Sequence, residues 1–140
     1  MITSSLPICR IATAHYRWRS APIPPSRLLT LFGLPRGTRL LGLDAGGRKD
    51  TSGRWLQARL RTAAGDRTLP MRRLRRALGL KSSLILAVHR RAGGLVLQGG
   101  GWGHGVGLCQ YGAVGQAKAG RSWRDILSHY FPGSTVEEHP

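Results

Sequence analysis

Residues 99–113 of this 140-residue chain read GGGWGHGVGLCQYGA. Six glycines fall between residues 99 and 107, and His104 stands among them with glycine on both sides. So many glycines indicate backbone conformations that other residues avoid, or the close approach of another chain or a ligand. The letters do not follow a dinucleotide-binding G-x-G-x-x-G pattern with a glycine-free interior, and no Gly-Lys-Ser/Thr follows. The alternative to a ligand-binding role is a purely structural one, in which this segment is a tight connection and the His104 imidazole forms a hydrogen bond with a carbonyl group.

The residues that follow this block predict two helices. Residues 108–119 are rich in small side chains and end at Gly120. Ser122 with Asp125 three positions on is similar to a capping box, which marks a helix start. An apolar stripe with spacing i, i+3, i+4, i+7 comes next: Trp123, Ile126, Leu127 and Tyr130. The second helix is therefore predicted to bury Trp123, and residues 131–133 end it.

The residues before the block predict strands and two further helices. The predicted strands are short apolar runs separated by turn residues: 39–43, 55–60, a third after 64–66, and the hairpin pair 84–88 and 95–97. The predicted helices, 25–32 and 71–78, begin next to prolines and end before Gly33 and Gly79. The fold class is α+β, with a small antiparallel sheet and several short helices. We expect residues 1–23 to be an irregular leading segment, 24–133 to form the domain and 134–140 to be a tail.

The glycine-rich block resembles the C-terminal signature of the sporulation stage II protein D family (SpoIID/LytB). The resemblance continues through residues 117–120 (AKAG) and 126–133 (ILSHYFPG), and covers residues 8–133 less sharply. Members of that family act on peptidoglycan, either as lytic transglycosylases of peptide-stripped glycan strands or as amidase enhancers. The resemblance implies a cell-envelope location, with glycan strands and a wall amidase as partners.

The resemblance also implies a glycan-binding groove. Its lining would be Trp102, Gly103, His104, Gly105, Gln110 and Tyr111. The polar groups among these residues suit sugar hydroxyls, and Trp102 could stack on a pyranose face. The sequence departs from the family's pattern at Gly100, where arginine is common.

No catalytic residue is identified in the sequence. Transglycosylation needs a carboxylic acid that first donates and then accepts a proton. In the family that glutamate belongs to an N-terminal half with a Pro-x-Glu stretch, and no such motif occurs here. The carboxylates present fall in predicted turns, in the first turn of a helix or in the tail: Asp44, Asp50, Asp66, Asp125, Glu137 and Glu138. We therefore expect an incomplete domain that is inactive alone, and whether the chain is an enzyme stays open.

No cofactor or metal site is expected either. His104 and Cys109 are five residues apart and supply only two ligands, which is half of a zinc site. The family's zinc ligands, where they occur, belong to the half for which no motif is found here.

The charge allows a further hypothesis. The chain has 22 Lys and Arg against 6 Asp and Glu, a net charge of +16. Such an excess suits an anionic partner, but an arginine-rich coding bias explains it equally well. Three functions thus stay open: part of a lytic transglycosylase, a non-catalytic wall-binding or amidase-enhancing protein, and a basic nucleic-acid-binding protein, which only the charge supports. No apolar run is long enough to span a membrane, and Arg10 interrupts the N-terminal segment too early for a secretory signal.

Overall fold

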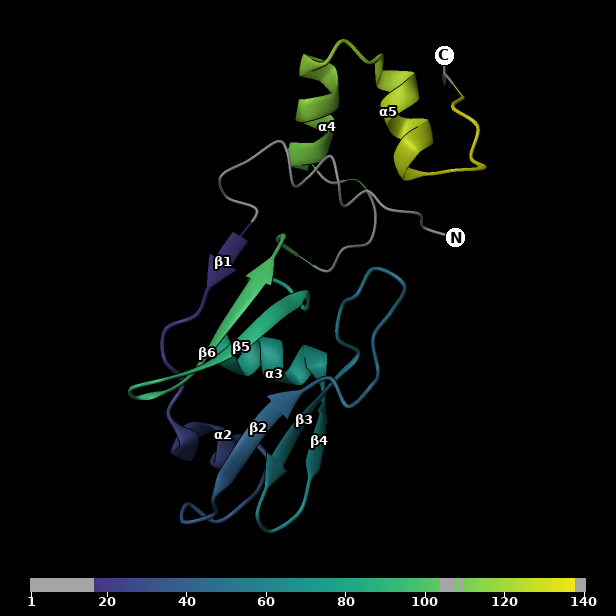
Figure 1. Cartoon of the computed structure of the whole chain (residues 1–140). Coiled ribbons are helices and arrows are strands. Elements are labelled where there is room, and N and C mark those ends of the chain that lie inside the picture. Colours follow the sequence, from purple (N-terminus) through teal and green to yellow (C-terminus); the bar gives the residue numbers. More distant parts are fainter. Residues whose placement is uncertain (1–16, 104–107, 109, 138–140) are drawn as a thin grey trace. The chain divides into compact units, whose positions relative to one another are not determined.

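The computed structural model describes residues 17–103, 108 and 110–137 of the chain. The polypeptide divides into two compact units, Arg17–His104 and a unit that contains Gly105–Pro140. Figure 1 shows the strands and two helices of the first unit and the helix pair of the second. Each unit is considered by itself below.

The first sheet of the larger unit has the strand order β1-β6-β5. Its members are antiparallel: β1 (Arg17–Arg19), β5 (Ile85–Arg91) and β6 (Gly94–Gly100). Strands β5 and β6 form the hairpin that the sequence predicts, with Gly93 and Gly94 at positive φ in its turn. Residues 17–19 belong to the predicted leading segment, and they are extended as strand β1, which pairs with the outer edge of β6. A strand of three residues is too short to show an alternating pattern in the sequence, and its pairing depends on a strand that is distant in the chain.

The second sheet has the order β2-β3-β4. Its strands are again antiparallel: β2 (Leu40–Asp44), β3 (Gln57–Thr62) and β4 (Arg67–Pro70). The sequence predicts these three strands but only one small sheet, whereas the structure has two three-stranded sheets. Trp55 lies outside β3, in an isolated bridge with Lys49.

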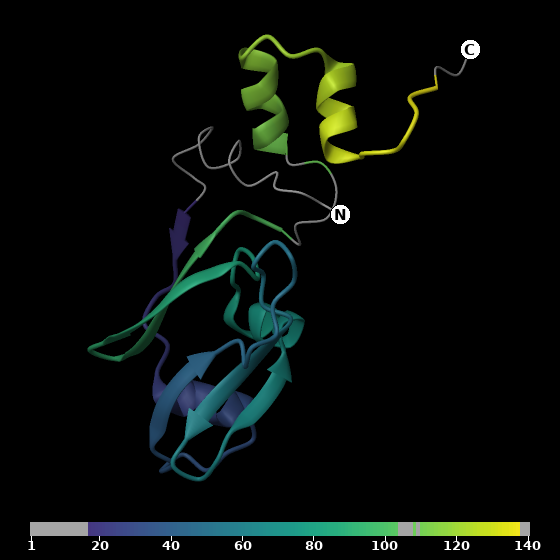
Figure 2. The ribbon, with the colours of Figure 1, turned by 45° about the vertical axis from the view of Figure 1, so that its right-hand side comes forward.

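Two helices cover the larger unit. Helix α2 (Pro25–Leu31) has proline at its first position, and α3 (Met71–Leu78) ends at Gly79 in the left-handed conformation. Figure 2 shows α2 behind the β2-β3-β4 sheet. Both helices were expected from their proline starts and glycine ends, and both are present.

One apolar core joins these helices to both sheets. Fully buried side chains come from four different elements: Leu28 and Leu29 of α2, Leu60 of β3, Leu74 of α3 and Leu97 of β6. Burial of one such leucine contributes about 1.5–3 kcal/mol relative to exposure. Since elements from residue 23 to residue 97 share this core, we expect the larger unit to unfold cooperatively.

The second unit contains helices α4 (Gln110–Lys118) and α5 (Trp123–Tyr130). Ser122 caps α5 by accepting a hydrogen bond from the backbone N–H of Asp125, as expected. The predicted burial of Trp123 is wrong, because its side chain is 51% exposed while Ile126 and Tyr130 are buried. In an eight-residue helix the first-turn member of the stripe projects beyond the packed face, and the Arg124 guanidinium lies over its ring. None of the described helices is long and apolar enough to cross a membrane.

The turn glycine Gly94 tests the register between β6 and the chain before α2. Its φ is 137°, and a Cβ there would collide with the carbonyl of Ile23, which exchanges backbone hydrogen bonds with Leu95. We expect Gly94→Ala to lower the free energy of unfolding by roughly 3 kcal/mol, measured in urea. Gly33→Ala is the control, since its site has positive φ but open space and costs only about 1 kcal/mol. Equal losses in the two variants would contradict the collision.

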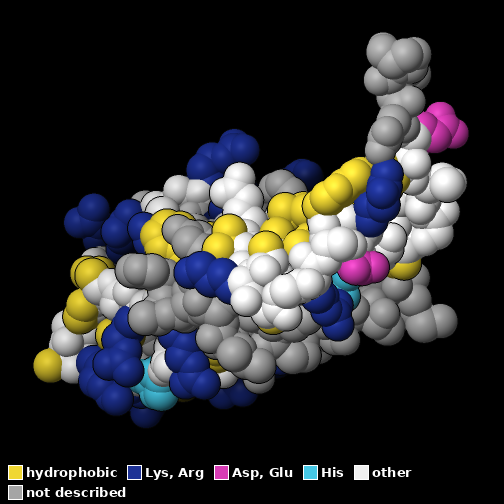
Figure 3. All heavy atoms as spheres, turned by 90° about the horizontal axis from the view of Figure 1, so that it is seen from above, with side chains coloured by type: hydrophobic (Ala, Val, Ile, Leu, Met, Phe, Trp, Pro, Cys, Tyr) yellow, Lys and Arg dark blue, Asp and Glu magenta, His cyan; other side chains and the backbone are white. Residues whose placement is uncertain are grey.

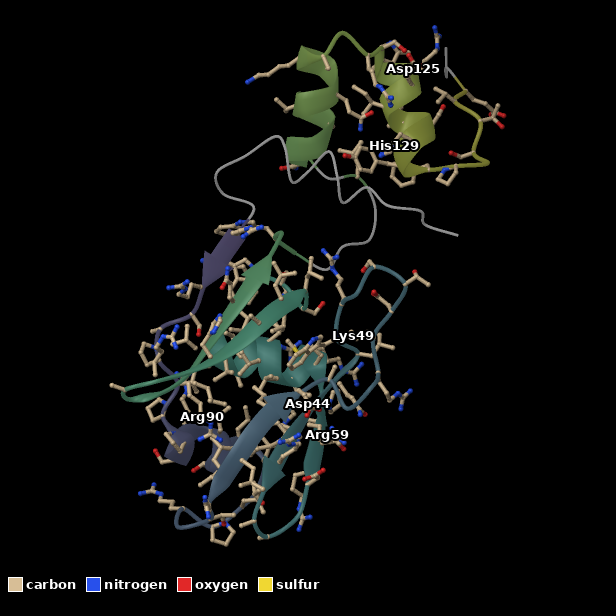
Figure 4. All side chains as sticks on the ribbon, in the orientation of Figure 1. Asp44, Lys49, Arg59, Arg90, Asp125 and His129 are labelled. Atoms are coloured by element: carbon tan, nitrogen blue, oxygen red, sulfur yellow. The ribbon has the colours of Figure 1, made fainter. Side chains whose placement is uncertain are left out.

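The ion pair between β2 and β3 predicts a pH dependence. Both carboxylate oxygens of Asp44 accept hydrogen bonds from Arg59, at 2.9 and 3.0 Å (Figure 4), and these bonds are the main cause of the lowered pKa of Asp44. Since the pKa is lower in the folded state, the pair stabilises the fold above the ordinary carboxyl pKa, and this contribution is lost as the pH falls through the folded-state value. The effect is small, because the two side chains are more than one-third exposed.

We therefore expect Asp44→Asn to be less stable than wild type at pH 7 and equal to it near pH 2. Asparagine keeps an oxygen that can accept the hydrogen bond from the Gly46 N–H, so the turn is preserved. Thermal unfolding across this pH range measures the difference. A difference that does not change with pH would show that Asp44 acts by some means other than its charge.

Candidate functional site at the glycine-rich end of strand β6

The described part of the glycine-rich block is held against the residues that precede β5. Beyond Gly100 the chain passes through Gly101 and Gly103, both with positive φ. The Gly103 N–H donates to the carbonyl of Lys81 at 2.9 Å, and Gly103 forms a parallel bridge with Ser82. The block is therefore an extension of the sheet at this point rather than a free loop.

A buried hydroxyl fixes this extension. The Ser82 side chain is fully buried and donates to the Gly100 carbonyl at 2.6 Å. The same oxygen accepts from the Leu84 N–H and from the Trp18 indole N–H, each at 3.3 Å. A hydroxyl has one donor and two acceptor positions, so Ser82 uses all of them. It connects β1, β6 and the start of β5 through one atom.

The glycine at residue 99 makes room for an aromatic ring. Gly99 is the register partner of Trp18, and a Cβ at residue 99 would collide with the Trp18 indole. Close approach does occur at this glycine, but the approaching group is a ring of the same chain and not the other chain or ligand expected from the sequence. Trp18 received no functional role from sequence, because 81 residues separate it from Gly99 and no local pattern joins them.

Trp102 is the exposed aromatic side chain of the block. It is 54% exposed, and the Lys81 ammonium lies 4.5 Å from the centroid of its ring. This distance allows a cation–π interaction that restrains the ring. An exposed indole can stack on the apolar face of a pyranose, and the ammonium beside it can bind an anionic or hydroxyl substituent. Lys81 was not singled out from sequence, because its relation to Trp102 depends on the pairing of Ser82 with Gly103.

The predicted groove residues divide between the two units. Trp102 and Gly103 belong to the larger unit, whereas Gln110 begins helix α4 and is exposed. His104 and Gly105 lie outside the described residues, and so does the side chain of Tyr111, whose backbone is part of α4. The assembly of these six residues into one groove stays a prediction.

Three described carboxylates have lowered pKa values. The pKa of Asp44 is lowered chiefly by its hydrogen bonds from Arg59, and that of Asp125 by the Ser122 hydroxyl. Burial acts to raise the pKa of Asp50, but hydrogen bonds from the turn that follows outweigh it. A general acid needs a raised pKa near neutral pH, so these groups suit structural roles. Within the described ranges, no three His, Cys, Asp or Glu side chains gather as metal ligands.

Loss of the buried hydroxyl should loosen the site. We expect Ser82→Ala to lower the free energy of unfolding by about 2 kcal/mol, because the Gly100 carbonyl and the Trp18 indole N–H lose their partner. The neighbouring Ser83→Ala is the control, since its side chain makes none of these bonds. Denaturant unfolding followed by indole fluorescence checks both, and a loss in Ser83→Ala equal to that in Ser82→Ala would refute the role of Ser82.

Sequence comparisons identify relatives of this chain. No family model matches it. Stage II sporulation protein D of Bacillus amyloliquefaciens is 33% identical over 143 aligned positions, which cover 97% of this chain and 40% of that protein. Stage II sporulation protein D of Bacillus subtilis (strain 168) is 30% identical, with the same two coverages. The amidase enhancer of Bacillus subtilis is 35% identical over 74 positions, which cover 51% of this chain and 10% of the enhancer.

The chain thus spans about 40% of the length of the sporulation proteins that it matches. Agreement along nearly all of this chain confirms the resemblance that the glycine-rich block carries. By sequence, the chain is a relative of the stage II sporulation protein D family.

Proposed function

We propose that this chain binds the glycan strands of peptidoglycan through the Trp102 surface and assists a wall amidase, without cleaving the strand itself. The observation that carries the proposal is the exposed indole of Trp102 beside the Lys81 ammonium, on a segment fixed by Ser82. Glycan strands present pyranose faces and acidic or hydroxylated substituents, which match these two groups.

The rigidity of the site supports a binding role. Only Gly101 separates Trp102 from the end of β6, and the hydrogen bond from Gly103 to Lys81 holds the far side of the turn. A side chain positioned before binding loses little conformational entropy when a sugar stacks on it. An aromatic platform that buries part of its surface contributes about 1–2 kcal/mol. One platform therefore supports weak binding that repeated sugars along a strand reinforce.

The titratable groups favour binding over cleavage. Cleavage by transglycosylation requires a protonated acid beside the leaving oxygen. Asp44, Asp50 and Asp125 have lowered pKa values and remain ionised near neutral pH. Cleavage would thus need an acid other than these three groups.

A related protein supports the choice of partner. The relative named amidase enhancer aligns with about half of this chain. Glycan binding is a direct way to bring an amidase close to the peptide stems that the glycan carries. The proposal therefore assigns the contact with the wall to this chain and the hydrolysis to its partner.

The exposed tryptophans provide a matched test. We expect Trp102→Ala to weaken binding to peptide-stripped glycan strands about tenfold, since a lost stacking contact of this size corresponds to that factor. Trp123→Ala is the control, because Trp123 is also about half exposed beside a guanidinium but lies on α5. Co-sedimentation with purified strands measures both affinities.

Two results would contradict the proposal. One is equal weakening by Trp102→Ala and Trp123→Ala, which would mean that the Trp102 surface has no special role. The other is the appearance of 1,6-anhydromuramyl ends when the chain alone is incubated with strands, since that product requires cleavage. Duplex DNA at moderate salt serves as the competing ligand, and tighter binding to it than to glycan would favour the nucleic-acid hypothesis.

A further inference from the structure

An open groove of about 440 Å³ lies between helices α2 and α3. Its polar lining comes from Ser26, Arg27, Thr30 and Arg36, and the end of α3 closes the other side. The Arg27 guanidinium donates to the carbonyl of Ala77 at 2.9 Å, which fixes the cation at the rim. A guanidinium has five N–H donors, so one such bond leaves most of them for a ligand.

The charge around this groove is of one sign. Three arginines on α3 are exposed: Arg72, Arg73 and Arg76. Residues 1–43 and 67–124 contain no Asp or Glu, and both helices fall within these stretches. Asp44 and Asp66 form their ion pairs with Arg59 and Arg61 on β3, and the described residues show no ion pair to an arginine of α2 or α3. The positive charge of the two helices is thus not neutralised within the described structure.

Figure 3 shows the same imbalance on the face that it views. Lys and Arg side chains occur over much of the described surface, whereas Asp and Glu are confined to a few places. A cluster of positive side chains raises the local concentration of anions. A groove with two arginines, one of them fixed, is therefore better suited to an anion than an isolated surface arginine.

The surroundings decide which class of anion fits. The apolar side of α3 is already buried through Met71 and Leu74, so this helix has no free apolar stripe for a lipid bilayer. No aromatic side chain lines the groove, so nucleobases would find no stacking partner there. Arginine instead matches phosphate oxygens with two parallel hydrogen bonds. The remaining candidate is a flexible chain of phosphate esters without bases.

We propose that the α2–α3 groove binds a polyol-phosphate polymer, with Arg27 and Arg36 on its phosphate groups and the hydroxyls of Ser26 and Thr30 toward its polyol groups. The choice of a wall-type polymer rests on the proposed function, which brings the chain to peptidoglycan. Helix α2 and the end of β6 lie at opposite ends of the larger unit in Figures 1 and 2. Glycan at Trp102 and a phosphate polymer at this groove can therefore be bound together.

The test uses the full chain and synthetic poly(glycerol phosphate) as the probe, with fluorescence anisotropy at 50 and 200 mM salt. The double variant Arg27→Gln/Arg36→Gln removes the two arginines that line the groove and should bind the probe about tenfold more weakly. Its control, Arg48→Gln/Arg67→Gln, removes the same net charge from exposed arginines outside α2 and α3, and should bind as wild type does. Thr30→Glu adds a negative charge to the groove without removing an arginine, and should also weaken binding.

The outcomes separate this proposal from the proposed function. Loss of probe binding in the groove variants, with unchanged co-sedimentation on glycan strands, supports the groove. Equal loss in the control double variant would overturn it, because bulk charge alone would then explain the affinity. Absence of probe binding in the wild type overturns the groove even when glycan binding is intact. Tighter binding to single-stranded DNA or to anionic lipid vesicles than to the probe would overturn the choice of polymer.

Discussion

The contact between the Trp18 indole and the backbone of Gly99 is the constraint on which the first sheet depends. It allows β1 to pair with β6, and the Ser82 hydroxyl then bonds both the indole and the next carbonyl along the strand. A side chain at residue 99 would push β1 away and leave Ser82 without an indole partner. This arrangement fixes the end of β6 at Gly100. It therefore also fixes the point from which the turn that carries the exposed Trp102 begins.

The distribution of charge has two separate consequences in the fold. Asp44 and Asp66 meet Arg59 across the second sheet, where they stabilise strand pairing. The helices α2 and α3 keep their arginines without such partners among the described residues. The net charge of +16 is therefore distributed unevenly, with paired arginines on the second sheet and arginines without such partners on α2 and α3. The local arrangement of the charge indicates more about binding partners than the total does.

Much of the fold could be predicted from local sequence signals. Proline starts and glycine ends gave α2 and α3, and turn residues separated the strands of the second sheet, because such signals act within a few residues. Strand β1 and the exposure of Trp123 could not be predicted. The first depends on a partner strand whose residue Gly99 is 81 residues from Trp18, and the second depends on which part of α5 another helix covers. The candidate site was predicted in part: Trp102 was singled out, whereas Lys81 and Ser82 were not.

The sequence by itself determined the family relation and the α+β class, because both depend on the order of residues along the chain. It also limited the number of candidate general acids, since the chain has only six carboxylates. The local sequence predicts that these lie in turns, at a helix start or in the tail. Only the tertiary structure decided that Lys81 lies over Trp102, that Ser82 joins three strands, and that α2 and α3 enclose a cationic groove. These are contacts between segments distant in the chain. These contacts form when the elements pack around a shared core, and a pattern within a few residues cannot predict such packing.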